Sequence, residues 1–225
     1  MMKYAKDLVR FALFRVPVDK FLKDLNFNKD FPFFLGLLFL GVLISVATLS
    51  IKMYFGPLPT LVNSDGTDFT LPILFIVFIF FGLFSSVVNY FLNCFAIHFL
   101  LTILKCKGNL SKTLGAIVKV LSSIQLTYSI PLQIIVLLIS IVLLSFQENE
   151  SFYSLSENII MGFSLIASLI FIIISLYLSV KVVKKLYNTS TIKAVAAVLF
   201  LHIVVLIIMV VFLILMLMYF TARPA

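Results

Sequence analysis

Seven polar or ionisable side chains fall inside stretches of the sequence that are otherwise apolar. They are Asn89, Asn93, His98, Lys119, Gln125, Tyr128 and His202. Counted from the charged ends of these stretches at 1.5 Å per residue, His98, Lys119 and His202 lie roughly 10–13 Å deep in one leaflet of a membrane. One interpretation is a polar cavity, open to the cytosol, that binds a small anion or a lipid headgroup with Lys119 as its charge.

A second interpretation of the same seven residues is structural, and we favour it. Asparagine, glutamine and histidine side chains commonly hydrogen-bond between transmembrane helices. A lysine near a helix end extends its amine toward the interface. On this interpretation the polar side chains hold helices together and line no binding site.

Catalytic chemistry has little support in the sequence. Cys94 and His98 stand four residues apart, on one face of a helix, but a metal needs three or four ligands. His202 could be the third ligand only if the last apolar stretch packs against the second. The sequence holds no phosphate-binding glycine loop, no spaced Ser-His-Asp set and no paired carboxylates. We therefore expect no catalytic residue, no metal site, no cofactor and no enzymatic activity.

Long apolar runs must position these side chains. The chain of 225 residues is 63% hydrophobic, with a mean hydropathy of +1.22, and several runs exceed the ~18 residues that mark a spanning helix. The sequence predicts an all-α membrane domain over residues 31–225, with a loop at residues 147–158 and a kink at Pro131. The five predicted transmembrane helices cover about 31–55, 71–104, 113–146, 159–183 and 194–220.

The sequence predicts that residues 1–30 form a cytosolic amphipathic segment in two halves, which Pro17 separates. Apolar residues share one helix face in each half; they are Tyr4, Leu8 and Phe11, then Val18, Phe21, Leu22 and Leu25. We expect these helices to lie at the membrane interface, with their apolar faces toward lipid and their basic residues toward anionic headgroups. The alternative is a cap packed on the helix bundle.

The basic residues gather on one side of the predicted membrane. Fifteen of the seventeen lysines and arginines lie in the N-terminal segment or near the two turns at residues 105–119 and 181–193, leaving only Lys52 and Arg223 for the other side. This distribution predicts a cytosolic N-terminus and an external C-terminus. The net charge of +8 follows membrane orientation and does not indicate nucleic-acid binding. The expected partners are the bilayer, with anionic lipid at its cytosolic face, and a second copy or another membrane protein.

Three segments carry a family resemblance. They are residues 17–25, residues 107–114 with the later Tyr-Ser-Ile-Pro, and residues 182–194. With these segments the chain resembles the short, prokaryote-like branch of the Yip (Ypt-interacting-protein) family of five-span membrane proteins. The motif positions that carry the resemblance are Gly108, Ser111, Tyr128, Pro131 and Lys193.

The resemblance implies a non-catalytic role in membrane organisation, trafficking or protein interaction. It places the chain in the cell membrane of a prokaryote, or in a Golgi or endoplasmic reticulum membrane if the source is eukaryotic. The polar residues leave two alternatives open. One is a passive transporter, channel or lipid-moving protein, and the other is an accessory subunit of a larger membrane complex.

Overall fold

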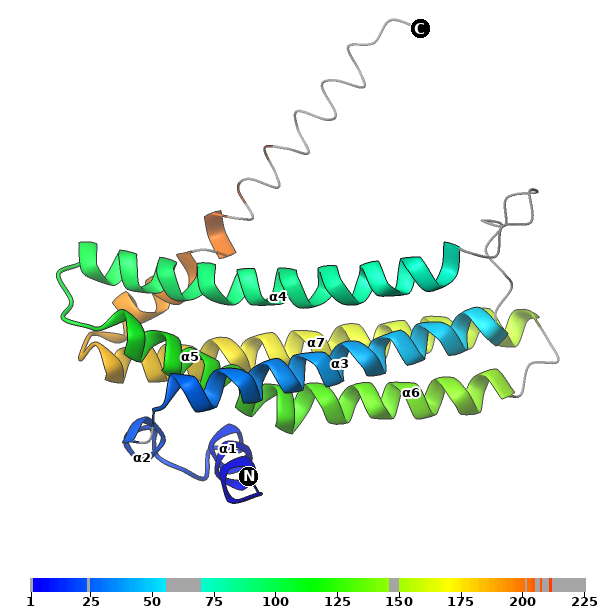
Figure 1. Cartoon of the computed structure of the whole chain (residues 1–225), viewed down its shortest axis with the longest axis horizontal. Helices are drawn as coiled ribbons and strands as arrows, with labels where there is room; N and C mark the ends of the chain where they lie inside the picture. The colour runs from blue at the N-terminus through cyan, green and yellow to red at the C-terminus, as the bar shows by residue number, and fades with distance from the viewer. Residues whose placement is uncertain are drawn as a thin grey trace, which may run out of the picture.

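The computed structural model describes residues 2–23, 25–55, 70–145, 150–200, 202–204, 207 and 211. The secondary structure of this part of the chain is helical. The longest helices run side by side, and α5 leads into α6 through the π-helical turn η1 (Figure 1). Their bounds are α3 (Phe27–Phe55), α4 (Thr70–Ile103), α5 (Leu110–Ile124), η1 (Gln125–Ser129), α6 (Ile130–Ser145) and α7 (Glu150–Leu186).

Within the described residues, four helical stretches are long and apolar enough to cross a membrane, and each overlaps one of the first four predicted spans. They are Phe27–Ile51, Ile79–Ile103, Leu110–Val142 and Asn158–Leu186. The fifth predicted span overlaps the shorter apolar helix Thr191–Phe200, and most of its remainder lies outside the described residues. Large hydrophobic side chains cover the outer surfaces of α4 and α7, as in helices that face lipid. The chain is an integral membrane protein; its fifth span and its orientation stay predictions.

The predicted loop at residues 147–158 is wrong for most of its length, because α7 begins at Glu150. Its polar residues suggested a connection between spans. From residue 150 onward, however, this stretch contains no proline or glycine, and it begins with Glu150, at the positive end of the helix dipole. Polarity therefore marks the end of the apolar span here, but the helix continues beyond it.

Pro131 coincides with a change of direction in the third span. The backbone N–H of Ile130 donates to the carbonyl of Gln125, five residues earlier, which widens the last turn before the proline. Proline lacks an N–H and crowds the preceding turn, so a widened turn accommodates it. Figure 1 shows α5 inclined to α6 at this point.

The N-terminal segment forms two helices, α1 (Met2–Ala12) and α2 (Val18–Lys23), which together we call the cap. Helix α1 packs on α5 and η1, and α2 packs on α7. Leu8, Phe11 and Phe21 are buried against apolar residues of α5 and α7, and the rings of Phe11 and Phe21 stack with their centroids 3.5 Å apart. The buried residues of the cap therefore contact the bundle, as in the second interpretation of this segment, and do not point into lipid.

The cap lies at the same end of the bundle as the turn after α4 and the turn after α7 (Figure 1). Both turns stop their helix in the same way. Lys105 and Asn188 adopt left-handed backbone angles, with φ of 57° and 45°, and the residue after each donates its N–H to a carbonyl five residues earlier. The next helix is then capped by the side chain of Asn109 or Ser190. We call this end, with its cap and two turns, the basic end.

Candidate functional site

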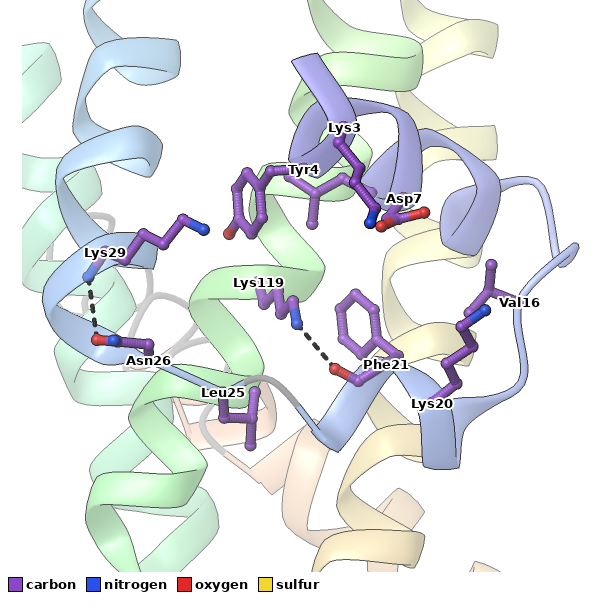
Figure 2. A pocket seen from close by; sticks show the side chains of 11 residues that line it. Lys3, Tyr4, Asp7, Val16, Lys20, Phe21, Leu25, Asn26, Lys29 and Lys119 are labelled. Carbon is purple, nitrogen blue, oxygen red and sulfur yellow. Dashed lines mark hydrogen bonds between the residues drawn. The ribbon is translucent and has the colours of Figure 1, made fainter. Parts of the chain in front are cut away.

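Lys119 lies in a cavity beneath the cap, which we call the cap cavity (Figure 2). The side chain is only 6% exposed, and its amine donates a hydrogen bond of 2.9 Å to the backbone carbonyl of Phe21. The same amine lies 4.8 Å from the centre of the Phe21 ring. Through this hydrogen bond, Lys119 of α5 attaches α2, which forms another wall of the cavity, to the bundle.

The cap cavity has a volume of about 610 Å³ and is formed by α1, α2, the start of α3 and α5. Among the described residues, three further lysines and one carboxylate line it, together with polar and apolar side chains. The described lining is Lys3, Tyr4, Asp7, Leu8, Val16, Lys20, Phe21, Leu25, Asn26, Lys29 and Lys119. The mixture of positive charge and apolar surface suits an amphipathic or anionic molecule.

A buried carboxylate fixes the wall of the cap cavity that α3 forms. Asp30 is fully buried in the first turn of α3, where it accepts hydrogen bonds from the Tyr4 hydroxyl and from the backbone N–H of Asn26. Burial, and then the nearby Asp30 carboxylate, raise the pKa of Tyr4, so its phenol stays protonated and donates. Asp30 is not among the seven candidate residues, because it precedes the predicted first span. The signal that could have found it is an acidic residue directly beside an apolar run.

Tyr128 also contributes to the attachment of the cap. Its hydroxyl donates a 3.0 Å hydrogen bond to the carbonyl of Ala12, the last residue of α1. Tyr128 belongs to η1, so the widened turn before Pro131 presents this side chain to the cap. Two of the seven candidate residues, Lys119 and Tyr128, thus connect the cap to the third span.

His98 lies at a separate junction, where three helices meet at the basic end. Its Nδ1 atom is 2.7 Å from the hydroxyl of Tyr187, and that hydroxyl is 2.6 Å from Oγ1 of Thr113. Gly108 lies against the same tyrosine, and a Cβ atom at this position would be 1.9 Å from the ring. Only a glycine leaves room for Tyr187 here, which gives the motif position Gly108 a packing role.

The other motif positions also fall at or near helix boundaries. The backbone N–H of Ser111 donates to the capping side chain of Asn109 at 2.8 Å. The Lys193 amine lies 3.4 Å from the carbonyl of Leu104, so it joins the two turns of the basic end. Pro131 follows η1, as described above. These positions shape turns and helix ends.

Asn89, Asn93 and His202 come together in a groove between α4 and α7, which we call the α4–α7 groove. It has a volume of about 200 Å³, and Ile117 and Leu121 of α5 form part of its wall. Serines add to its polar lining; they are Ser86, Ser175 and Ser179. In the described part of the chain, the hydrogen bonds of Asn93 and His202 stay within a helix turn: Asn93 donates to the carbonyl of Asn89 at 2.8 Å, and a ring nitrogen of His202 lies 3.2 Å from the carbonyl of Val198.

Gln125 lies in the interior of the bundle, near Gly41 of α3 and a second glutamine, Gln133. Gln133 and Ser129 line a further cavity of about 290 Å³ among α3, α6 and α7. The Oε1 atom of Gln133 is buried and has no hydrogen-bond partner within the described part of the chain. Gln133 is not among the seven candidate residues, although a glutamine two residues after Pro131 in an apolar run is a signal that the sequence offers.

The seven candidate residues therefore divide among four places: the cap contacts, the junction at Tyr187, the α4–α7 groove and the bundle interior. Lys119 does not line the α4–α7 groove with the asparagines. Among the described residues, no three histidine, cysteine or carboxylate side chains lie close enough together to hold a metal ion. Cys94 is buried, and His98 contacts Tyr187.

Comparison with known proteins gives one match. Neither the curated proteins nor the solved structures include a protein that matches this chain. A family model, described as the Yip1 domain, matches residues 11–214 and so covers the second half of the cap and the described bundle. The chain belongs to the Yip1 domain family.

Proposed function

We propose that this protein is a non-catalytic membrane protein that organises membrane or partner proteins through its basic end. The observation that supports this most is the arrangement of charge. The cap and both turns place exposed lysines and arginines at one end of the bundle, on a scaffold held by hydrogen bonds between helices. A rigid, positively charged surface next to lipid headgroups suits docking of anionic lipid or of acidic segments of other proteins.

The family supports the same conclusion, since Yip1 domain proteins are generally membrane proteins without enzymatic activity. The site geometry agrees. The hydroxyls of Tyr128 and Tyr187 are engaged in contacts between helices, and Lys119 contacts the cap backbone. These groups position structural elements and are not arranged as a nucleophile with its base. The expected location is the cell membrane of a prokaryote.

Site-specific photo-crosslinking in intact cells tests this proposal. A photoreactive amino acid replaces Lys107 or Lys112, which are exposed at the basic end, and a matched variant carries it at Ile173, which is 66% exposed on α7. We expect discrete protein adducts from the basic end, including adducts with a second copy, and lipid adducts from Ile173. The proposal fails if the two regions give the same adducts.

The α4–α7 groove favours a second candidate function, a passive transporter or lipid-moving protein. Asn89, Asn93 and His202 place polar atoms along helices whose outer surfaces are apolar. A row of polar side chains of this kind could guide a lipid headgroup along the surface of the bundle. Flux of small solutes and of fluorescent lipids in liposomes tests it, with Asn93→Leu as the variant. Saturable flux that this variant abolishes would favour transport over docking.

The third alternative, an accessory subunit, makes a different prediction for the same crosslinking experiment. A subunit of a fixed complex would give one dominant adduct, and the amount of this adduct would stay in constant ratio to the amount of the protein. It would also co-purify with that partner in mild detergent. A docking protein would give several adducts whose amounts vary with growth conditions.

A further inference from the structure

We propose that the cap cavity is a binding site for a phosphate group, and that the group it takes is the headgroup phosphate of an anionic phospholipid. This goes beyond the docking function proposed above, since a lipid could bind in the cavity whether or not the basic end has a protein partner. The argument rests on the charge, the depth and the lining of the cavity.

The charge of the cavity is the first step. Its four lysines come from four different helices: Lys3 from α1, Lys20 from α2, Lys29 from α3 and Lys119 from α5. Among the described residues, Asp7 is the carboxylate that lines the cavity, while the buried Asp30 in the α3 wall accepts hydrogen bonds from Tyr4 and Asn26. Figure 2 shows Asp7 beside Lys3 on the α1 side, away from Lys29 and Lys119. Lysines that converge from separate elements give a local positive potential, which attracts a phosphate.

The depth of the charges is the second step. Lys3, Lys20 and Lys29 are exposed, while Lys119 is only 6% exposed and lies at the α5 wall of the cavity (Figure 2). An anion that enters past the three exposed amines meets a fourth positive charge inside. Because the inner amine is shielded from water, its attraction for an anion is screened less by salt than the attraction of a surface lysine.

The lining indicates a lipid more than a free ion. The cavity of about 610 Å³ is much larger than one phosphate, and apolar side chains of α1, α2 and the α2–α3 connection cover part of its wall. It lies at the basic end, where the membrane headgroups are expected, and basic pockets beside transmembrane helices are a recurrent headgroup site. A phosphate with attached glycerol and the first carbons of an acyl chain would use both kinds of surface.

Binding by the purified full-length protein in a neutral detergent tests the proposal. The probes are dioctanoyl phosphatidic acid, dioctanoyl phosphatidylcholine and inorganic phosphate. We expect saturable binding of one phosphatidic acid per chain and much weaker binding of phosphatidylcholine. Equal affinity for inorganic phosphate would keep the phosphate site but would assign it to a soluble ligand, overturning the lipid half of the proposal.

Variants then locate the binding site. The double variant Lys20→Gln, Lys29→Gln changes two exposed residues of the cavity and should weaken phosphatidic acid binding by roughly tenfold or more. The matched control is Lys112→Gln, an exposed lysine of the basic end that does not line the cavity, and it should bind as the parent protein does. Lys119→Met should weaken binding further; if it fails to fold, the double variant still decides. Non-saturable binding, or an equal loss in the Lys112→Gln control, would overturn the proposal.

Discussion

The basic end and the α4–α7 groove use polar side chains in opposite ways. At the basic end, the polar atoms of Lys119, Tyr128 and Tyr187 contact groups on other elements, 98, 116 and 74 residues away in sequence. In the groove, Asn93 and His202 contact carbonyls of their own helices, four residues away. A polar residue inside a membrane helix therefore fixes tertiary structure when its partner is on another element, and leaves it unaffected when its partner is in its own helix.

The largest difference in the free energy of unfolding should come from replacing glycines with alanine. Gly108→Ala would place a Cβ atom 1.9 Å from the Tyr187 ring, so the ring must move and its contact with Thr113 is disturbed. We expect a loss of about 3 kcal/mol in the free energy of unfolding. Equilibrium unfolding in detergent measures it.

The matched control is Gly36→Ala on α3, where nothing lies within 4 Å of the added Cβ. This variant should be at least as stable as the parent protein, by up to about 1 kcal/mol, because alanine favours the helix more than glycine does. Equal destabilisation by the two alanines would contradict the tight packing assigned to Gly108.

Lys119→Met should have the next largest effect on the free energy of unfolding. It removes a hydrogen bond from a buried charged group to the carbonyl of Phe21, which we expect to cost about 2 kcal/mol. Faster backbone hydrogen exchange in α2 would report the loosened cap directly.

Asn93→Leu in the groove is the comparison for Lys119→Met, because Asn93 bonds only within α4 in the contacts that the structure describes. Its cost should stay below about 0.5 kcal/mol, with no change in hydrogen exchange of the cap. A larger effect from Asn93→Leu than from Lys119→Met would reverse the comparison between the two regions.

Tyr128→Phe should cost about 1 kcal/mol, since it removes one neutral hydrogen bond and leaves the Ala12 carbonyl without the Tyr128 hydroxyl. Hydrogen exchange should rise at the end of α1. Tyr177→Phe, on the half-exposed surface of α7, serves as control and should leave exchange in α1 unchanged. Similar exchange in both variants would argue against the Tyr128 contact.

The smallest effect should come from the surface ion pair between Lys185 and Asp19. The two side chains are 57% and 64% exposed and their charged atoms are 3.0 Å apart. Lys185→Gln should cost less than about 0.5 kcal/mol, and salt should remove the difference. Unfolding at low and high salt checks this, and a salt-independent loss would show that Lys185 acts through packing.

Hydropathy predicted the positions of the first four spans, because length and apolar composition are sufficient to identify a membrane helix. It could not predict where α7 begins, since a helix that extends into a polar stretch has no apolar signal. The orientation of the cap could not be predicted either. An amphipathic helix presents the same pattern to lipid and to the apolar residues of α5 and α7, and only the tertiary arrangement distinguishes them.

Residue counting predicts the depth of each polar residue and its angle on its own helix, but not which neighbour that angle faces. One of the two interpretations placed Lys119 and Asn93 in a single polar cavity open to the cytosol. On α5, however, Ile117 and Leu121 face the α4–α7 groove, and Lys119 lies two positions from each. At 100° per residue this places Lys119 on the opposite side of the helix, toward the cap. The angular position of each residue could have been read from the sequence, but the neighbour on each face could not.

The central claim is that the cap is part of the folded bundle. A spin-label distance between Lys6→Cys on α1 and Lys181→Cys on α7, in protein with Cys94→Ala and Cys106→Ala, tests it most directly. Both label positions are exposed. In vesicles with and without anionic lipid, we predict the same single, narrow distance distribution. A broad distribution, or a distance that changes with lipid charge, would show that the cap lies on the membrane surface and would contradict the claim.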